Sequence, residues 1–257
     1  MATFVSIEWV AERLGTDGLV VIDTRSAMRY LQGHLKDAVN LPLRKVLDPQ
    51  SRLLPSGELV ALFGSIGLGD GVTPVLYDGY DGRNAAMVAW TLEYLGRSDV
   101  HIMDVVFDKW REQGREIFYR PVPVQSRQFT AKVNPAVRAS LPDISDAPDL
   151  ILVDNRSREE YNGETDIDEK PGHIPGAVNI VWQELLGDDG RLLCSQEKAR
   201  QALDAAKIGR NDRIVAYCKV GARAAVGYLA FKQLGYDVRL YDASYAEWEQ
   251  SGQPIEK

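Results

Sequence analysis

The sequence is poor in cysteine and histidine, and this scarcity excludes several kinds of site. Its 257 residues include two cysteines and three histidines, namely Cys194, Cys218, His34, His101 and His173. Two cysteines cannot build a disulfide framework, and none of these residues has the spacing of a paired metal-ligand motif. We therefore expect no bound metal.

Long apolar runs and clusters of basic residues are also missing. No apolar run approaches the roughly 18 residues that a membrane-spanning helix needs, so we expect no membrane insertion. A formal charge of −7, without grouped lysines and arginines, argues against binding to nucleic acid. The first residues lack a basic stretch followed by an apolar one, which predicts no secretory signal and a cytoplasmic, reducing location.

What the chain does contain is one pattern of residues that occurs twice, about 139 residues apart. Leu19 to Asp23 and Leu150 to Asp154 are apolar runs that end in aspartate, and each precedes an arginine, a helical stretch and a Gly-His pair. Further on, Val75 to Asp78 corresponds to Val215 to Cys218, and each precedes a helical stretch that ends at a glycine. A period this long exceeds that of solenoid repeats, so it predicts two duplicated domains.

Within each copy, short apolar strands alternate with helical segments. This order predicts two α/β domains, each with a mostly parallel sheet flanked by helices. We expect the first domain at residues 1–118, a proline-containing linker at 119–128 and the second domain at 129–257. Reactive groups in such sheets gather at the carboxyl ends of strands, and Cys218 is predicted to lie at one of these ends.

The stretch from Tyr217 to Ala225 is the candidate active site. It places Cys218 between the end of a buried strand and a helix expected over Ala222 to Leu234. Unpaired N–H groups in such a turn and the positive end of a helix dipole favour the thiolate form of a cysteine, and Lys219 and Arg223 add positive charge. The alternative is an inert buried cysteine, which would need neither the turn nor the flanking cations.

Four further residues are candidates for binding substrate or holding the loop. Gly221 permits a backbone conformation that other residues rarely adopt. Lys219 is the best candidate for attracting an anion, although a solvated surface lysine would have the same sequence context. Arg223 either faces the substrate or pairs with a carboxylate, and we favour the pairing. Arg156 either lines the entrance or forms a buried ion pair.

These motifs, taken together and in order, resemble those of the rhodanese sulfurtransferases. The similarity rests on the Cys218 loop and on three further stretches, Asp154-Asn155-Arg156, Gly172 to Asn179 and Tyr241 to Trp248. Two copies with a cysteine only in the second are similar to the tandem-domain thiosulfate and mercaptopyruvate sulfurtransferases. Asp78 takes the cysteine position in the first copy, and because a carboxylate cannot carry sulfane sulfur, we expect that copy to be catalytically silent.

The resemblance implies a two-step transfer of sulfane sulfur through a persulfide on Cys218. Thiosulfate would be the donor, and cyanide, a thiol or a protein would be the acceptor. No metal or organic cofactor would be needed. The negative charge of the persulfide would be held by the loop that follows the cysteine, through the backbone N–H groups of Lys219, Val220, Gly221, Ala222 and Arg223.

The loop departs from both familiar versions, so alternatives remain. Cys218 to Arg223 reads Cys-Lys-Val-Gly-Ala-Arg, which is neither the Cys-Arg-Lys-Gly-Val-Thr of thiosulfate-type enzymes nor the Cys-Gly-Ser-Gly-Val-Thr of mercaptopyruvate-type ones. Glu160 stands where many tandem members carry a substrate-binding arginine. The charge of Lys219 favours thiosulfate, with mercaptopyruvate as the alternative donor. A persulfide carrier without turnover would need the same loop, whereas related phosphatases have five residues between cysteine and arginine instead of four.

Overall fold

The computed structural model describes residues 2–145 and 149–257, which form two compact units that we describe separately. The first unit comprises residues up to 134 together with 188–192, and the second comprises 135–187 and 193–257. Residues 119–128, where the sequence predicts a linker, form neither helix nor strand. The chain beyond them still belongs to the first unit, since the Lys132 N–H donates to the Leu95 carbonyl and the Asn134 N–H to that of Tyr94.

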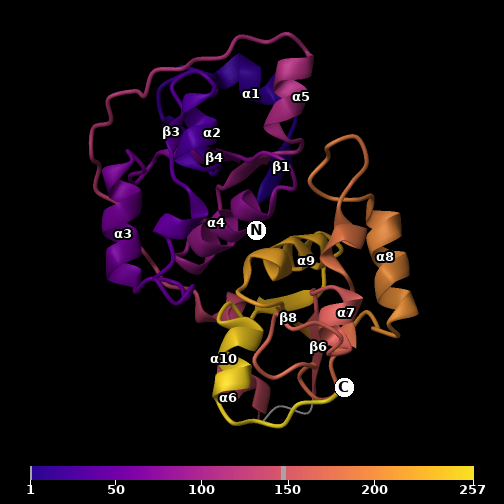
Figure 1. Cartoon of the computed structure of the whole chain (residues 1–257). Helices are drawn as coiled ribbons and strands as arrows, with labels where there is room; N and C mark the ends of the chain where they lie inside the picture. The colour runs from indigo at the N-terminus through magenta and orange to yellow at the C-terminus, as the bar shows by residue number, and fades with distance from the viewer. Residues whose placement is uncertain (1, 146–148) are drawn as a thin grey trace. The chain divides into compact units, whose positions relative to one another are not determined.

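The first unit contains a five-stranded sheet in the order β1-β5-β4-β2-β3, and its strand pairs are parallel (Figure 1). The strands are β1 (Thr3–Val5), β2 (Leu19–Asp23), β3 (Val39–Asn40), β4 (Thr73–Tyr77) and β5 (His101–Met103). The helices are α1 (Ile7–Arg13), α2 (Ala27–Leu31), α3 (Ser56–Ser65), α4 (Arg83–Tyr94) and α5 (Phe107–Glu112), with a 3-10 turn, η1 (Leu43–Lys45).

The core of this unit follows from the alternation of side chains along the strands. Val21 of β2 pairs in register with Val75 of β4, and Tyr77 lies two residues after Val75 on the same strand. All three side chains therefore share one face of the sheet. They join one buried cluster with side chains of α1, α2 and α5, including Val10, Tyr30, Phe107 and Trp110. The longer helix α4 packs on β4 and β5. Helices therefore cover the sheet as the sequence pattern predicts.

The second unit repeats this arrangement with a four-stranded parallel sheet in the order β7-β6-β8-β9. Arg138 adds a parallel bridge to Leu240, at the edge where β1 lies in the first unit. The strands are β6 (Leu150–Asp154), β7 (Val178–Asn179), β8 (Arg213–Tyr217) and β9 (Asp237–Leu240). The helices are α6 (Leu141–Ser145), α7 (Arg158–Tyr161), α8 (Gln196–Ala205), α9 (Ala222–Gln233) and α10 (Ser244–Gln250), with 3-10 turns η2 (Pro135–Val137) and η3 (Trp182–Leu185). The predicted duplication is confirmed.

Each of the two histidines of the repeat stacks on a tyrosine of the preceding helix. His34 stacks on Tyr30 with ring centroids 4.0 Å apart, and His173 stacks on Tyr161 at 3.7 Å. Both histidines are buried, and one ring nitrogen of each lies within 3 Å of a backbone carbonyl, that of Leu35 or Tyr161. This stacking contact occurs in the second unit, which contains Cys218, and also in the first unit, which contains no cysteine. It therefore belongs to the fold and not to sulfur chemistry.

Candidate active site

Cys218 lies directly after the last residue of β8, at the carboxyl end of a strand that is paired on both sides. Its side chain is buried, with 1% of the residue exposed. Three residues later the chain enters α9 through Gly221, whose φ of 87° is strained for any residue with a Cβ atom. The helix then runs from Ala222 to Gln233, one residue short of the prediction. The predicted strand, loop and helix are thus confirmed.

Residues at the start of α10 form hydrogen bonds with this loop. The Cys218 N–H donates to the Ser244 hydroxyl at 3.1 Å, and the Cys218 carbonyl accepts the Tyr245 N–H at 3.0 Å. The Lys219 carbonyl accepts the Ala246 N–H at 3.1 Å. Ser244 itself has a φ of 58°, and a left-handed serine has no sequence signature. The contact between Cys218 and Ser244, which are 26 residues apart in sequence, links the cysteine loop to the start of α10.

The backbone N–H groups from Lys219 to Ala224 are open. Across residues 2–145 and 149–257, none of these six groups donates to an acceptor. The first protein-bonded N–H of the helix is that of Ala225, which reaches the Gly221 carbonyl at 2.9 Å. Unpaired N–H groups at a helix N-terminus attract anions, because their partial positive charges add to the helix dipole. The loop is therefore an anion cradle beside a sulfur atom.

Arg223 connects this cradle to α7. Its guanidinium forms a two-pronged ion pair with Glu160, with N···O distances of 2.6 and 2.8 Å. Burial alone lowers the pKa of Arg223, but hydrogen bonding to Glu160 and the charge and hydrogen bonding of Cys218 raise it above its ordinary value overall. Arg223 thus pairs with a carboxylate, as we favoured from the sequence, and also lies close enough to Cys218 to interact with it.

Lys219 also has acidic partners. Its ammonium lies 2.6 Å from Asp168 and 2.5 Å from Glu249, and both carboxylates are buried. Burial lowers the pKa of Lys219, yet the hydrogen bonds and charges of the two carboxylates outweigh it and raise the pKa overall. Two negative charges therefore offset the single positive charge on which the sequence argument for thiosulfate depended. A role of Lys219 in substrate binding stays a prediction.

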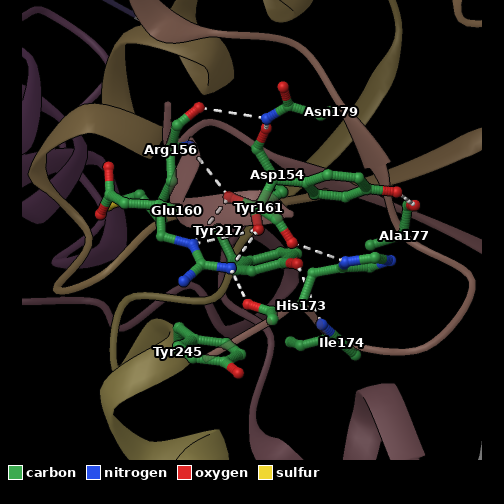
Figure 2. Close-up of polar contacts among 12 residues, drawn as sticks. Asp154, Arg156, Glu160, Tyr161, His173, Ile174, Ala177, Asn179, Tyr217 and Tyr245 are labelled. Carbon is green, nitrogen blue, oxygen red and sulfur yellow. Dashed lines mark hydrogen bonds and ion pairs between the residues drawn. The ribbon is translucent and has the colours of Figure 1, made fainter. Parts of the chain in front are cut away.

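Arg156 is wholly buried and lies at the centre of a second network (Figure 2). Its guanidinium donates to Asp154, to Asp168 at 2.7 Å and to the Gly172 carbonyl at 2.7 Å. It also lies over the ring of Tyr245 at 3.9 Å. The structure therefore shows the buried ion pair, one of the two roles predicted for Arg156. Contact with a substrate stays untested.

Asp78 fills the corresponding cradle of the first unit with its own carboxylate. One oxygen accepts the Gly79 N–H at 2.8 Å, and the other accepts the N–H groups of Asn84 and Ala85 at 2.9 and 3.2 Å. The loop between β4 and α4 has five residues, one more than the loop between β8 and α9. The chain therefore contains an internal example of this loop type with a carboxylate bound to its backbone.

Asp78 makes the stability of the protein depend on pH. Burial raises its pKa from 3.8 to about 6, although the N–H groups that it accepts act in the opposite direction. The folded state thus binds this proton more tightly than the unfolded state, so stability from this group is present below about pH 4 and is lost as the pH rises to about 6. Relative to the native protein, Asp78→Asn should gain up to about 3 kcal/mol of unfolding free energy between pH 4 and pH 7.

Urea unfolding of both proteins at several pH values measures this difference. The exposed Asp17→Asn serves as the matched control and should follow the native curve at each pH. A difference between Asp78→Asn and the native protein that does not change with pH would show that Asp78 has no raised pKa.

Neither a metal-binding cluster nor a membrane-spanning helix occurs in the residues that the structure describes. No group of three or more histidine, cysteine, aspartate and glutamate side chains in this part of the chain is arranged to hold a metal ion. None of the described helices is both long and apolar enough to cross a membrane. Neither cysteine forms a disulfide with a residue that the structure describes, and Cys194 is half-buried.

The sequence matches the model of the rhodanese-like domain twice, over residues 6–113 and 138–251. It is 32% identical to the thiosulfate sulfurtransferase of Corynebacterium glutamicum over 95% of this chain and 86% of the relative. It is 30% identical to the thiosulfate sulfurtransferase of Azotobacter vinelandii over 96% of each chain. A third relative, the thiosulfate sulfurtransferase of Pseudomonas aeruginosa, is 31% identical over 93% of this chain and 91% of its own.

Solved structures share the fold at lower sequence identity. The wild-type structure of EanB superposes with a TM-score of 0.90 and 21% identity, covering 99% of this chain and 69% of the other. The anaerobic ergothioneine biosynthesis enzyme from Chlorobium limicola, in complex with trimethyl histidine, has the same TM-score and identity and is covered over 70% of its length.

Proposed function

Because this chain belongs to the rhodanese-like domain family, with two such domains in tandem, we propose that it moves sulfane sulfur from thiosulfate to cyanide or a thiol through a persulfide on Cys218. The loop from Cys218 to Ala224 carries this proposal, since it joins a single thiol to six N–H groups without an acceptor in the described chain. The relatives named as thiosulfate sulfurtransferases support thiosulfate as the donor.

In the first step the Cys218 thiolate attacks the outer sulfur of thiosulfate. A new sulfur–sulfur bond forms to Cys218, the sulfur–sulfur bond of thiosulfate breaks, and sulfite leaves with the bonding electron pair. The negative charge then resides on the terminal sulfur of the persulfide. N–H groups that are already oriented stabilise such a charge without the cost of reorienting solvent.

In the second step the acceptor removes the terminal sulfur. The carbon of cyanide, or the sulfur of a thiolate, attacks it, and the bond to the Cys218 sulfur breaks with its electron pair returning to Cys218. The products are thiocyanate or a persulfide of the acceptor, together with the original thiolate. Donor and acceptor thus react in turn, which gives ping-pong kinetics. A reducing compartment such as the cytoplasm would keep Cys218 available as a thiol.

Asp78 supports the assignment of the loop as an anion site. Within the same chain, backbone N–H groups at this position of the fold donate to a carboxylate. Cys218 leaves the equivalent groups open for an external anion or for the persulfide. The same comparison favours mercaptopyruvate as a second candidate donor, because its carboxylate is the chemical group that Asp78 presents to its own loop.

Comparing the two donors at a fixed acceptor concentration tests the proposal. We expect kcat/KM with thiosulfate to exceed that with mercaptopyruvate, with parallel double-reciprocal lines as the acceptor is varied. The reverse order would identify a mercaptopyruvate enzyme. Formation of a persulfide without any steady-state turnover would identify a sulfur carrier instead of an enzyme.

Removal of the guanidinium of Arg223 should make Cys218 less reactive. A nearby cation promotes the reaction of a cysteine with an electrophile, so Arg223→Gln should slow alkylation of Cys218 by iodoacetamide by about 10-fold. The buried Glu160 would lose its partner in this variant. The double variant Glu160→Gln with Arg223→Gln therefore serves as the control for that unpaired charge.

The alkylation rate should remain low in this double variant if Arg223 acts on the sulfur. Recovery of the native rate would mean that Arg223 serves only to neutralise Glu160. Arg158→Gln, whose ion pair with Glu184 is exposed, should leave the rate unchanged.

A further inference from the structure

The first unit contains a cavity of about 240 Å³ that is lined by charged side chains. Three arginines from different elements reach it, since Arg25 follows β2, Arg29 lies on α2 and Arg83 begins α4. Two carboxylates, those of Asp78 and Asp81, also line it. Arg25 is paired with the buried Asp23 and Arg83 with Asp81, so attraction of an anion depends on the remaining arginine, Arg29.

Both carboxylates of this cavity are already engaged by their own loop. The N–H groups of the loop and of α4 hold Asp78, as described above. Asp81 accepts the Arg83 N–H at 3.2 Å, and its other oxygen lies 3.4 Å from the Arg83 guanidinium. Their hydrogen bonds offset part of the negative charge, so they repel an incoming anion less than free carboxylates would.

Arg29 is the arginine that is left to bind a ligand. Arg25 is buried and donates to Asp23 and to the Gly33 carbonyl. The guanidinium of Arg29, in contrast, is exposed and forms neither a hydrogen bond nor an ion pair with the residues that the structure describes. A guanidinium presents parallel donors that match the two oxygens of a carboxylate.

Tyr80 adds an aromatic surface to the same cavity. It is 82% exposed, and its φ of 62° lies in the left-handed region that bulky residues seldom adopt. Left-handed backbone costs roughly 1–2 kcal/mol for such a residue, which an exposed ring does not recover by burial. A strained and exposed aromatic residue is expected where its ring contacts a ligand.

We propose that this cavity, whose wall includes Arg29 and Tyr80, binds a small organic carboxylate with a planar body, such as an aromatic acid. Arg29 binds the carboxylate, and the ring of Tyr80 packs against the planar body. The site lies in the unit without a cysteine, so it is separate from the sulfur chemistry proposed for Cys218.

Calorimetric titration of the full chain with benzoate tests this site. We expect a dissociation constant on the order of 1 mM, which is typical of a ligand of this size. Arg29→Gln should raise that constant about 10-fold, because one charged hydrogen-bond donor is lost. The exposed Lys36→Gln removes a cation outside the cavity and should leave the constant unchanged.

Two further variants distinguish a binding role from a structural one. Tyr80→Asn relieves the strained backbone, since asparagine tolerates a left-handed conformation, and should keep the protein folded while weakening benzoate binding several-fold. Cys218→Ser should bind benzoate as the native protein does, which separates this site from the cradle at Cys218. The proposal is overturned if benzoate does not bind at tens of millimolar, if Cys218→Ser abolishes binding, or if neither Arg29→Gln nor Tyr80→Asn weakens it.

Discussion

Cys218→Ser should abolish sulfur transfer while the protein stays folded. A hydroxyl is a far weaker nucleophile than a thiolate and cannot form a persulfide, so turnover with thiosulfate and cyanide should fall by at least about 10³-fold. The exchange changes one atom at a buried position, and the backbone contacts of Cys218 to Ser244 and Tyr245 do not involve its sulfur. Thiocyanate formation measures the loss of sulfur transfer, and the circular dichroism spectrum measures whether the protein stays folded.

Mass spectrometry after incubation with thiosulfate identifies the thiol that carries the sulfur. The native protein should gain one sulfur atom on Cys218, and the matched variant Cys194→Ser should gain it equally. The half-buried Cys194 is the control because it is the second free thiol of the chain. Sulfur found on Cys194, or native turnover in Cys218→Ser, would contradict the mechanism.

Arg156→Gln should cost about 3–5 kcal/mol of unfolding free energy. The guanidinium of Arg156 is fully buried between Asp154 and Asp168, and its loss leaves Asp154 in the interior without a cation and Asp168 with Lys219 alone. The charge is not restored by glutamine, whose amide has fewer donors than a guanidinium. Urea unfolding at neutral pH measures the change.

Arg158→Gln is the matched control for this prediction. Arg158 pairs with Glu184 on the surface, with 71% and 46% of the two side chains exposed, so its loss should cost no more than about 1 kcal/mol. If Arg156→Gln also cost less than about 1 kcal/mol, the buried network would not contribute to stability as its geometry indicates.

The strands and helices around the site could be predicted because their signals are local. Leu19 to Asp23 and Leu150 to Asp154 are apolar runs of strand length, and the structure forms β2 and β6 over these same residues. Gly235, which follows the last turn of α9, marks the helix end through its positive φ. The position of Cys218 at the end of β8 follows from these local signals alone.

The partners in the ion pairs of the site could not be identified from the sequence, because they are far apart in the chain. Glu160 and Arg223 are 63 residues apart, and Lys219 and Glu249 are 30 apart. One signal was present in retrospect. Glu160 and Arg223 are both departures from the expected family pattern, and they carry opposite charges that the structure pairs.

The extra residue in the Asp78 loop limits how this protein can change in evolution. Asp78→Cys alone would place a thiol in a longer turn, with Asn84 at the helix position that Arg223 occupies in the second unit. A copy of the Cys218 loop there would require a deletion and at least two substitutions, and Asp78→Cys removes a carboxylate that accepts hydrogen bonds from three backbone N–H groups. No single substitution therefore converts the Asp78 loop into the Cys218 loop.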